Sequence, residues 1–292
     1  MAKFPRRRAK TGVAQAKLPK NSRFSRFARR ARGLDLERPR PRGIYLLPNA
    51  FTTAALFCGF YAIVMAMNQK FEHSAWAIFI AMILDGLDGR VARLTNTQSE
   101  FGAQYDSLSD MVSFGAAPAL VIYEWSLRGL GKLGWLAAFI YCAGAALRLA
   151  RFNTNIEVVD KRYFQGLPSP AAAALVVGFI LMMSDPDINI SARSVDWLSW
   201  TIAIFAGLSM VSNIPFYSFK DVNFKKSVPF IVVFLIALGF ALVAINPAVA
   251  LWPIFLVYGL SGYAIFMLRL AKGKPVNIVS MEEGPLDRDE RR

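Results

Sequence analysis

Four aspartates lie close together in a chain that is otherwise rich in apolar residues. They occur in the stretch DGLDGRVARLTNTQSEFGAQYDSLSD, which runs from Asp85 to Asp110. Carboxylate oxygens grouped without histidine or cysteine are the ligands that hard divalent cations such as Mg²⁺, Mn²⁺ and Ca²⁺ prefer. Four unpaired negative charges are too costly in a region of low dielectric constant. The cluster therefore predicts either protonated carboxyl groups or a bound divalent cation.

The spacing of the aspartates predicts a helical hairpin. Asp85 and Asp88 are three residues apart and Asp106 and Asp110 are four apart, so each pair shares one face of a helix. The polar segment between the pairs can turn at a membrane surface. Asp88 lies about nine residues before a turn centred near Thr97, and Asp106 about nine residues after it. Two antiparallel helices would therefore bring all four carboxylates to the same depth.

Small residues accompany the acids. Gly86, Gly89 and Ala92 recur at three-residue steps and leave one helix face without bulky side chains. Such a face is either a helix-packing groove or a slot in which a ligand lies against the backbone. The interleaved carboxylates favour the slot. Arg93 follows Gly89 by one turn and is placed to meet a phosphate.

The rest of the chain predicts an all-α polytopic integral membrane protein. Of its 292 residues 55% are hydrophobic, and several apolar runs approach the roughly 20 residues that cross a bilayer. We expect about eight transmembrane helices. The expected spans are residues 46–67, 73–94, 104–125, 134–150, 168–184, 197–214, 228–246 and 249–270.

The distribution of positive charge predicts the orientation. The net charge is +14, and fifteen of the 34 lysines and arginines lie in residues 1–43. The loops on the side of the termini carry nine more, against four on the opposite side. The positive-inside rule therefore places both termini and the turn of the aspartate hairpin in the cytosol, as expected for a protein of the inner (cytoplasmic) membrane.

The terminal segments are expected to lie outside the bundle. Residues 1–43 form a basic cytosolic arm, either an interfacial amphipathic helix around Phe24 and Phe27 or a disordered tail. Without a nucleic-acid-binding fold, no nucleic-acid partner is expected. We expect a catalytic transmembrane core over residues 44–184, the remaining helices over 185–271 and a disordered charged tail over 272–292.

The hairpin resembles the motif of the CDP-alcohol phosphotransferase family, whose members move a phosphatidyl-type group from a CDP-linked lipid to an alcohol and release CMP. The resemblance implies two divalent metal ions, Mg²⁺ or Mn²⁺, bound by Asp85, Asp88 and Asp106 with Asp110 beside them. It also implies that Asp110 is the general base and that the Gly86–Gly89 face holds the cytidine nucleotide. The pattern D-G-x-D-G-x2-A-R-x8-G-x3-D-x3-D is matched at Asp85, Gly86, Asp88, Gly89, Ala92, Arg93, Gly102, Asp106 and Asp110.

Further segments resemble the phosphatidylserine synthase branch of that family. They are LPNAFTTAALFCGF, FGAQYDSLSDMVSFGAAPAL, RLARFN and QGLPSPAAAA, within residues 46–175. The glycerophosphate branch has a proline and a lysine where this chain has Ser107 and Met111. The resemblance implies that the chain is a homodimer and transfers a phosphatidyl group from CDP-diacylglycerol to L-serine among membrane lipids.

Four other residues are candidate ligand contacts. Arg148 and Arg151, at the cytosolic end of the fourth span, could grip a phosphate or the serine carboxylate. The competing interpretation is that they are anchors reaching toward lipid headgroups. Asn49 and Thr52 could hydrogen-bond the nucleotide or a diphosphate oxygen, with Asn49 as a helix cap the alternative.

Two other functions stay open. A sister transferase would use glycerol phosphate, inositol phosphate or choline, and Lys161 and Arg162 keep a phosphate-bearing acceptor in consideration. A metal- or proton-coupled transporter would also carry intramembrane acids. Carriers, however, tend to place their site near the midplane between two repeats, whereas all four acids here lie in one hairpin.

Overall fold

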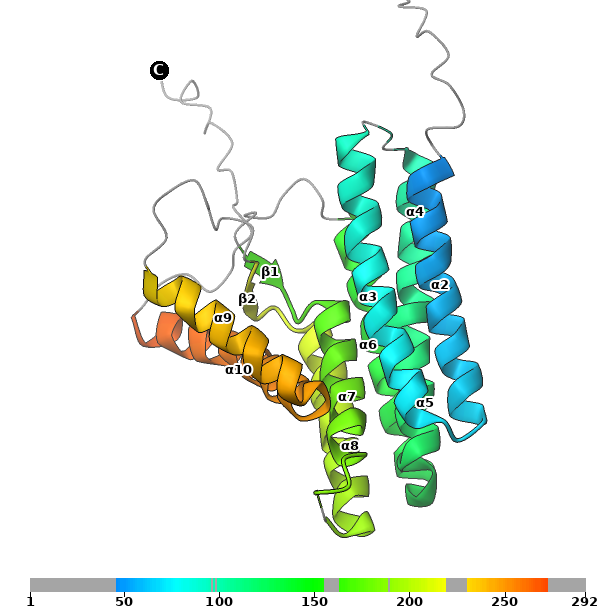
Figure 1. Cartoon of the computed structure of the whole chain (residues 1–292), viewed down its shortest axis with the longest axis vertical. Coiled ribbons are helices and arrows are strands. Elements are labelled where there is room, and N and C mark those ends of the chain that lie inside the picture. The colour runs from blue at the N-terminus through cyan, green and yellow to red at the C-terminus, as the bar shows by residue number, and fades with distance from the viewer. Residues whose placement is uncertain are drawn as a thin grey trace, which may run out of the picture. The chain divides into compact units, whose positions relative to one another are not determined.

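The computed structural model describes residues 46–95, 97, 99–154, 163–188, 190–218 and 230–272, all within the unit from Gly43 to Arg292. The predictions for the basic arm and the charged tail lie outside these residues, apart from Lys272. The described part is helical with one small two-stranded sheet (Figure 1). The elements are α2 (Leu46–Met67), α3 (Phe71–Leu94), α4 (Glu100–Asp110), the π-helix η2 (Met111–Ala116), α5 (Ala117–Trp125), the 3₁₀-helix η3 (Leu127–Leu130), α6 (Lys132–Thr154), β1 (Tyr163–Gln165), α7 (Ser169–Met183), α8 (Ala192–Val211), β2 (Pro215–Tyr217), α9 (Phe230–Ile245) and α10 (Pro247–Ala271).

Helices α2 and α3 form a tightly packed antiparallel hairpin (Figure 1). The alanines Ala62, Ala66 and Ala81 are almost wholly buried, and small side chains of this kind let helix backbones approach closely. The buried hydroxyl of Ser74 donates to the carbonyl of Ala62 across the pair, at 2.6 Å. This packing fixes the position of the helix that carries Asp85.

The third predicted span is one helical run, residues 100–125, formed by α4, η2 and α5. It begins four residues earlier than predicted, because the Ser99 side chain accepts a hydrogen bond from the Gly102 amide and caps the helix. Two buried serines attach the run to α2. Ser109 donates to the Thr52 carbonyl and Ser113 to the Ala55 carbonyl, each at 3.1 Å.

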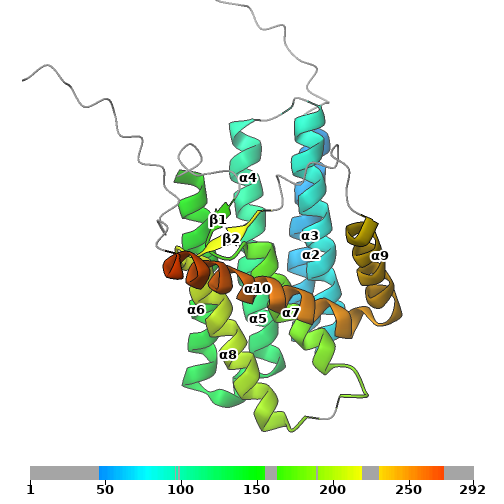
Figure 2. The same ribbon diagram turned by 90° about the vertical axis from the view of Figure 1, so that its left-hand side faces the viewer.

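Helix α7 is the core of the bundle. Residues 171–181 are all buried, which fits a helix that is apolar on every side. At 1.5 Å per residue its 15 residues extend about 22 Å, less than the roughly 30 Å of a hydrocarbon layer. Helix α10 packs against α7 and runs across it rather than alongside it (Figures 1 and 2).

Two loop contacts close the bundle. Strands β1 and β2 pair in antiparallel fashion, with Phe164 opposite Phe216. In the other contact the Asn246 amide donates to the Asp185 carboxylate at 2.7 Å, joining the α7–α8 turn to the start of α10. This hydrogen bond holds the pKa of Asp185 below its usual value.

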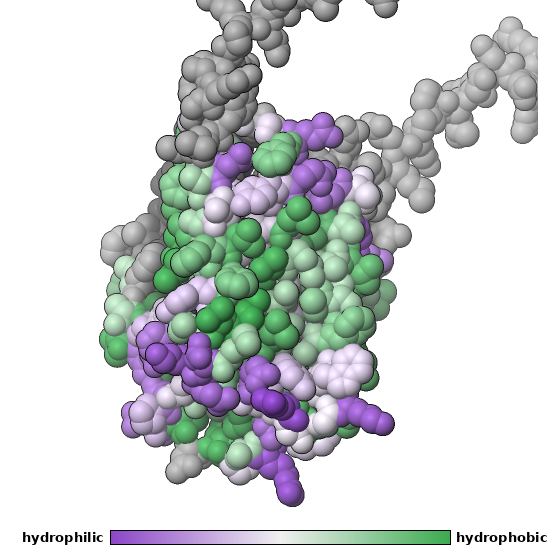
Figure 3. All heavy atoms as spheres, turned by 90° about the vertical axis from the view of Figure 1, so that its right-hand side faces the viewer, coloured by the Kyte–Doolittle hydropathy of each residue, from purple (hydrophilic) through white to green (hydrophobic). Residues whose placement is uncertain are grey.

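The surface is that of an integral membrane protein. Figure 3 shows a broad apolar region between hydrophilic residues at its two ends. Among the described residues four helices are long and apolar enough to span a membrane, namely α2 from Pro48 onward, α6, α8 and α10. Helix α8 corresponds to the sixth predicted span, residues 197–214, and starts five residues earlier than predicted. The Ser191 side chain caps it there by accepting a hydrogen bond from the Ser194 amide.

Candidate active site

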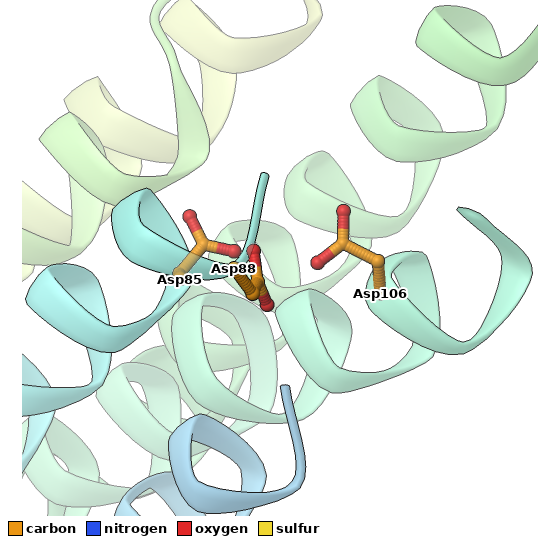
Figure 4. Close-up of side chains that lie close together, drawn as sticks. All are labelled: Asp85, Asp88 and Asp106. Carbon is orange, nitrogen blue, oxygen red and sulfur yellow. The ribbon is translucent and has the colours of Figure 1, made fainter. Parts of the chain in front are cut away.

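Three carboxylates converge between α3 and α4. One carboxylate oxygen from each of Asp85, Asp88 and Asp106 lies within 4.8 Å of the other two. Figure 4 shows Asp85 and Asp88 on neighbouring turns of α3 and Asp106 facing them from α4. The hairpin predicted from the spacing is therefore confirmed, with its turn between Leu94 and Glu100.

Asp110 completes the cluster from the other end of α4. Its carboxyl group hydrogen-bonds that of Asp85. Asp88 and Asp106 are nearly equidistant from residue 97, and so are Asp85 and Asp110, as an antiparallel pair requires. Asp110 therefore lies beside Asp85, and the four aspartates belong to one group of acids.

Thr52 of α2 contacts the cluster through a hydrogen bond to Asp88. Its hydroxyl is buried and lies 2.8 Å from Oδ2 of Asp88 and 3.1 Å from the carbonyl of Pro48. The hydroxyl has one proton for these two acceptors, and the shorter bond, to a charged group, is the stronger. Thr52 therefore orients the Asp88 carboxylate, a role that sequence reasoning missed because the two residues are 36 positions apart. Asn49 lies inside the first turn of α2, not at a cap, since the helix already includes Leu46.

The face beside the acids is open, as predicted. A Cβ atom added at Gly86 or at Gly89 would meet nothing within 4 Å. Gly102 differs, because an added Cβ there would lie 3.1 Å from Ser99 Oγ and 3.6 Å from Asn49 Oδ1. The tight contact at Gly102 is with the Ser99 cap of its own helix, and 3.6 Å to Asn49 is ordinary van der Waals contact, whereas Gly86 and Gly89 leave space for a ligand.

Ala92 and Arg93 lie at the end of α3 that is predicted to face the cytosol. Ala92 is half-buried and Arg93 is exposed. The Arg93 Nε donates to the Gly89 carbonyl of its own helix at 2.9 Å. The two terminal nitrogens of the guanidinium lie beyond this bond on the exposed side chain. Arg93 therefore stays a candidate for a phosphate at the edge of the open face.

Arg148 of α6 is a buried cation that interacts with the cluster. Its side chain is 9% exposed and interacts electrostatically with Asp110. Nη1 donates to Ser169 Oγ at 2.9 Å, whereas the buried Nε has no partner among the described residues. A buried guanidinium with an unused donor beside a carboxyl cluster is suited to binding an anionic group.

Arg151 takes a different role from the one predicted. Its guanidinium donates to the carbonyls of Met210, Val211 and Ser212 at the carboxyl end of α8, at 3.0 to 3.2 Å. It also contacts the Gln165 carbonyl and Asn213 Oδ1, both at 3.0 Å. These are the carbonyls that a helix end leaves unpaired. Arg151 therefore caps α8 and holds β1, and we do not retain it as an acceptor-binding residue.

The donor set suits a hard divalent cation. All the clustered ligands are carboxylate oxygens, the chemistry that Mg²⁺ and Mn²⁺ favour. In addition, the Asp106 Oδ1 atom is buried without a hydrogen-bond partner among the described residues. An orphaned, buried carboxylate oxygen facing two other acids is a free ligand position for such an ion.

Comparisons with known proteins agree with this geometry. The family model described as CDP-alcohol phosphatidyltransferase matches residues 45–211. The chain is 36% identical over 234 residues to the CDP-diacylglycerol–serine O-phosphatidyltransferase of Helicobacter pylori (79% of this chain, 96% of the relative). It is 35% identical over 223 residues to the protein of that name from Methanocaldococcus jannaschii (76% and 96%). The match includes the aspartate hairpin and the helices that position it, so this chain belongs to the CDP-alcohol phosphatidyltransferase family.

Proposed function

We propose that the chain is a CDP-diacylglycerol–serine O-phosphatidyltransferase. It transfers the phosphatidyl group of CDP-diacylglycerol to the hydroxyl of L-serine and releases CMP. The convergence of Asp85, Asp88 and Asp106 on one small volume carries the proposal. Relatives of that name, which align over most of this chain, support serine as the acceptor.

Each residue of the site has a role in this reaction. Asp85, Asp88 and Asp106, with Asp110 beside them, would hold divalent metal ions, two of Mg²⁺ or Mn²⁺. Such ions neutralise the diphosphate and stabilise the negative charge that develops during transfer. The open Gly86–Gly89 face accommodates the cytidine nucleotide, with Arg93 at its edge, and Asn49, near Gly102, is a further candidate contact. Thr52 keeps Asp88 oriented.

Asp110 is the general base. The serine oxygen forms a bond to the phosphorus that carries the diacylglycerol, and the bond from this phosphorus to the oxygen bridging to CMP breaks. CMP leaves with the bridging oxygen, and the proton of the serine hydroxyl passes to the Asp110 carboxylate. Arg148, which is buried and interacts electrostatically with Asp110, binds the serine carboxylate or a phosphate oxygen.

Acceptor screening tests the function. Purified protein with Mn²⁺ and CDP-diacylglycerol should release CMP when L-serine is added, and far less with glycerol 3-phosphate, inositol phosphate or choline. Preference for another acceptor would make the chain a sister transferase. CMP release with no acceptor would contradict both assignments, while transport without CMP release would favour a carrier.

The proposed topology has eight spans, both termini in the cytosol and the active site at the cytosolic face of the inner membrane. In a variant without Cys58 and Cys142, single cysteines can be placed in two exposed turns at opposite ends of α3. Thr95→Cys should react with an impermeant maleimide only from the cytosolic side, and Asn68→Cys only from the outer side. Labelling of both from one side would refute the orientation. A homodimer, implied by the family, predicts a mass of two chains in light scattering.

A further inference from the structure

The helix that carries Asp106 and Asp110 is not α-helical throughout. Directly after Asp110 it passes through the π-helical segment η2 (Met111–Ala116) before continuing as α5. A π-turn contains one more residue than an α-turn, and such turns are uncommon and concentrated at functional sites. Since one residue corresponds to about 100° of rotation, η2 changes the rotational position of α4 relative to α5 by about that amount.

Proline at position 118 helps to explain the π-turn. In an α-helix, residue 118 would donate its amide to the Phe114 carbonyl, but proline has no N–H. The Phe114 carbonyl instead accepts a hydrogen bond from the hydroxyl of Tyr141 on α6, at 2.9 Å. Both side chains are almost completely buried. The bond therefore stands where the bond of a regular helix is missing.

The helices before and after η2, α4 and α5, are each held by contacts with other helices. Below it, Ala117, Val121 and Ile122 of α5 are wholly buried. Above it, Ser109 is bonded to the α2 backbone, and Asp110 meets Asp85. Segment η2 therefore joins two anchored helices, and its extra residue enters the rotation of α4 relative to α5.

We propose that Tyr141 is a positioning residue of the transfer reaction: by holding the Phe114 carbonyl, its hydroxyl maintains the π-turn that directs Asp106 and Asp110 toward Asp85 and Asp88. The proposal rests on the proposed function, since it assigns Tyr141 a role in the same site. Tyr141 touches no reacting atom, and it acts through the helix backbone. Its aromatic ring packs in the core, so only the hydroxyl is assigned this role.

Two variants test the proposal, with the acceptor that the unaltered protein prefers. Tyr141→Phe keeps the ring and removes the hydroxyl. We expect kcat to fall at least tenfold, the KM for CDP-diacylglycerol to change less than twofold, and the rise in melting temperature caused by Mn²⁺ alone to shrink. Tyr61→Phe, which alters an exposed tyrosine of α2, is the matched control and should match the unaltered protein.

The double variant Tyr141→Phe with Pro118→Ala separates positioning from simple stabilisation. Residue 118 then has an amide that can pair with the Phe114 carbonyl in α-helical geometry. Its melting temperature should recover toward that of the unaltered protein while kcat stays at least tenfold low. Recovery of kcat together with stability, or an unaltered kcat and Mn²⁺ response in Tyr141→Phe, would overturn the proposal. If Tyr141→Phe fails to fold, the double variant alone decides between these outcomes. Loss of the proposed function would appear separately, as no serine-dependent CMP release by the unaltered protein.

Discussion

The Thr52–Asp88 hydrogen bond offers a sharp test of the metal site. Thr52→Val replaces a buried hydroxyl by a methyl group of nearly equal size, so the packing of α2 against α3 is kept. The bond removed joins Thr52 Oγ1 to Asp88 Oδ2 at 2.8 Å. A hydrogen bond to a charged group contributes about 1.5–3 kcal/mol. With a factor of ten for each 1.4 kcal/mol, its loss corresponds to roughly a 10- to 100-fold change in an equilibrium constant.

This loss should appear in the metal requirement. Groups that orient metal ligands typically alter affinity by about 10- to 100-fold when they are removed, which agrees with the value from the hydrogen bond. We expect the Mn²⁺ concentration for half-maximal CMP release to rise by at least tenfold in Thr52→Val. The maximal rate should largely recover at saturating Mn²⁺, because every carboxylate remains.

Two controls make the test decisive. Thr52→Ser keeps the hydroxyl and should stay within about threefold of the unaltered protein. The Mn²⁺-induced rise in melting temperature reports binding without turnover, and it should shrink in the valine variant only. An unchanged Mn²⁺ requirement in Thr52→Val would refute the reasoning that Thr52 orients a metal ligand.

Three further variants address other parts of the site. Asp110→Asn should abolish serine-dependent CMP release yet leave binding of CDP-diacylglycerol measurable by calorimetry; full activity would remove the base assignment. Gly86→Ala should raise the KM for CDP-diacylglycerol at least tenfold while the melting temperature holds or rises, since alanine favours a helix by about 0.5–1 kcal/mol and its Cβ meets no protein atom. Arg151→Met should lower stability by about 2 kcal/mol, the scale of hydrogen bonds from a charged group, with the KM for serine unaltered; a selective rise in that KM would return Arg151 to the acceptor site.

Local sequence information predicted the aspartate hairpin well. The spacings of three and four residues define helix faces, and the turn lies midway between the two pairs, so the depth of each carboxylate followed from counting. Helix ends were less predictable. Ser99 and Ser191 each start a helix before its apolar stretch begins, because a capping side chain satisfies amides regardless of hydropathy.

The remainder depends on contacts between distant residues. Arg151 caps a helix about 60 residues away, and Thr52 and Tyr141 bond to partners 36 and 27 positions away. Their polar groups gave no sign in the sequence of which partner they would find. Pro118 in FGAAPA did carry a signal, since a proline in a helical run leaves one carbonyl without its donor. The residue that satisfies this carbonyl is evident only from the packing of α6.

Asp110 interacts with acidic residues and with one buried arginine. Its carboxyl group bonds that of Asp85, which lies on α3 next to the open Gly86–Gly89 face. It also interacts electrostatically with Arg148, which joins α6 to Ser169 at the start of α7. A phosphoryl donor bound along the α3 face and an acceptor held by Arg148 would therefore approach each other across Asp110. In the proposed reaction, a base in that position takes the acceptor proton as the new bond to phosphorus forms.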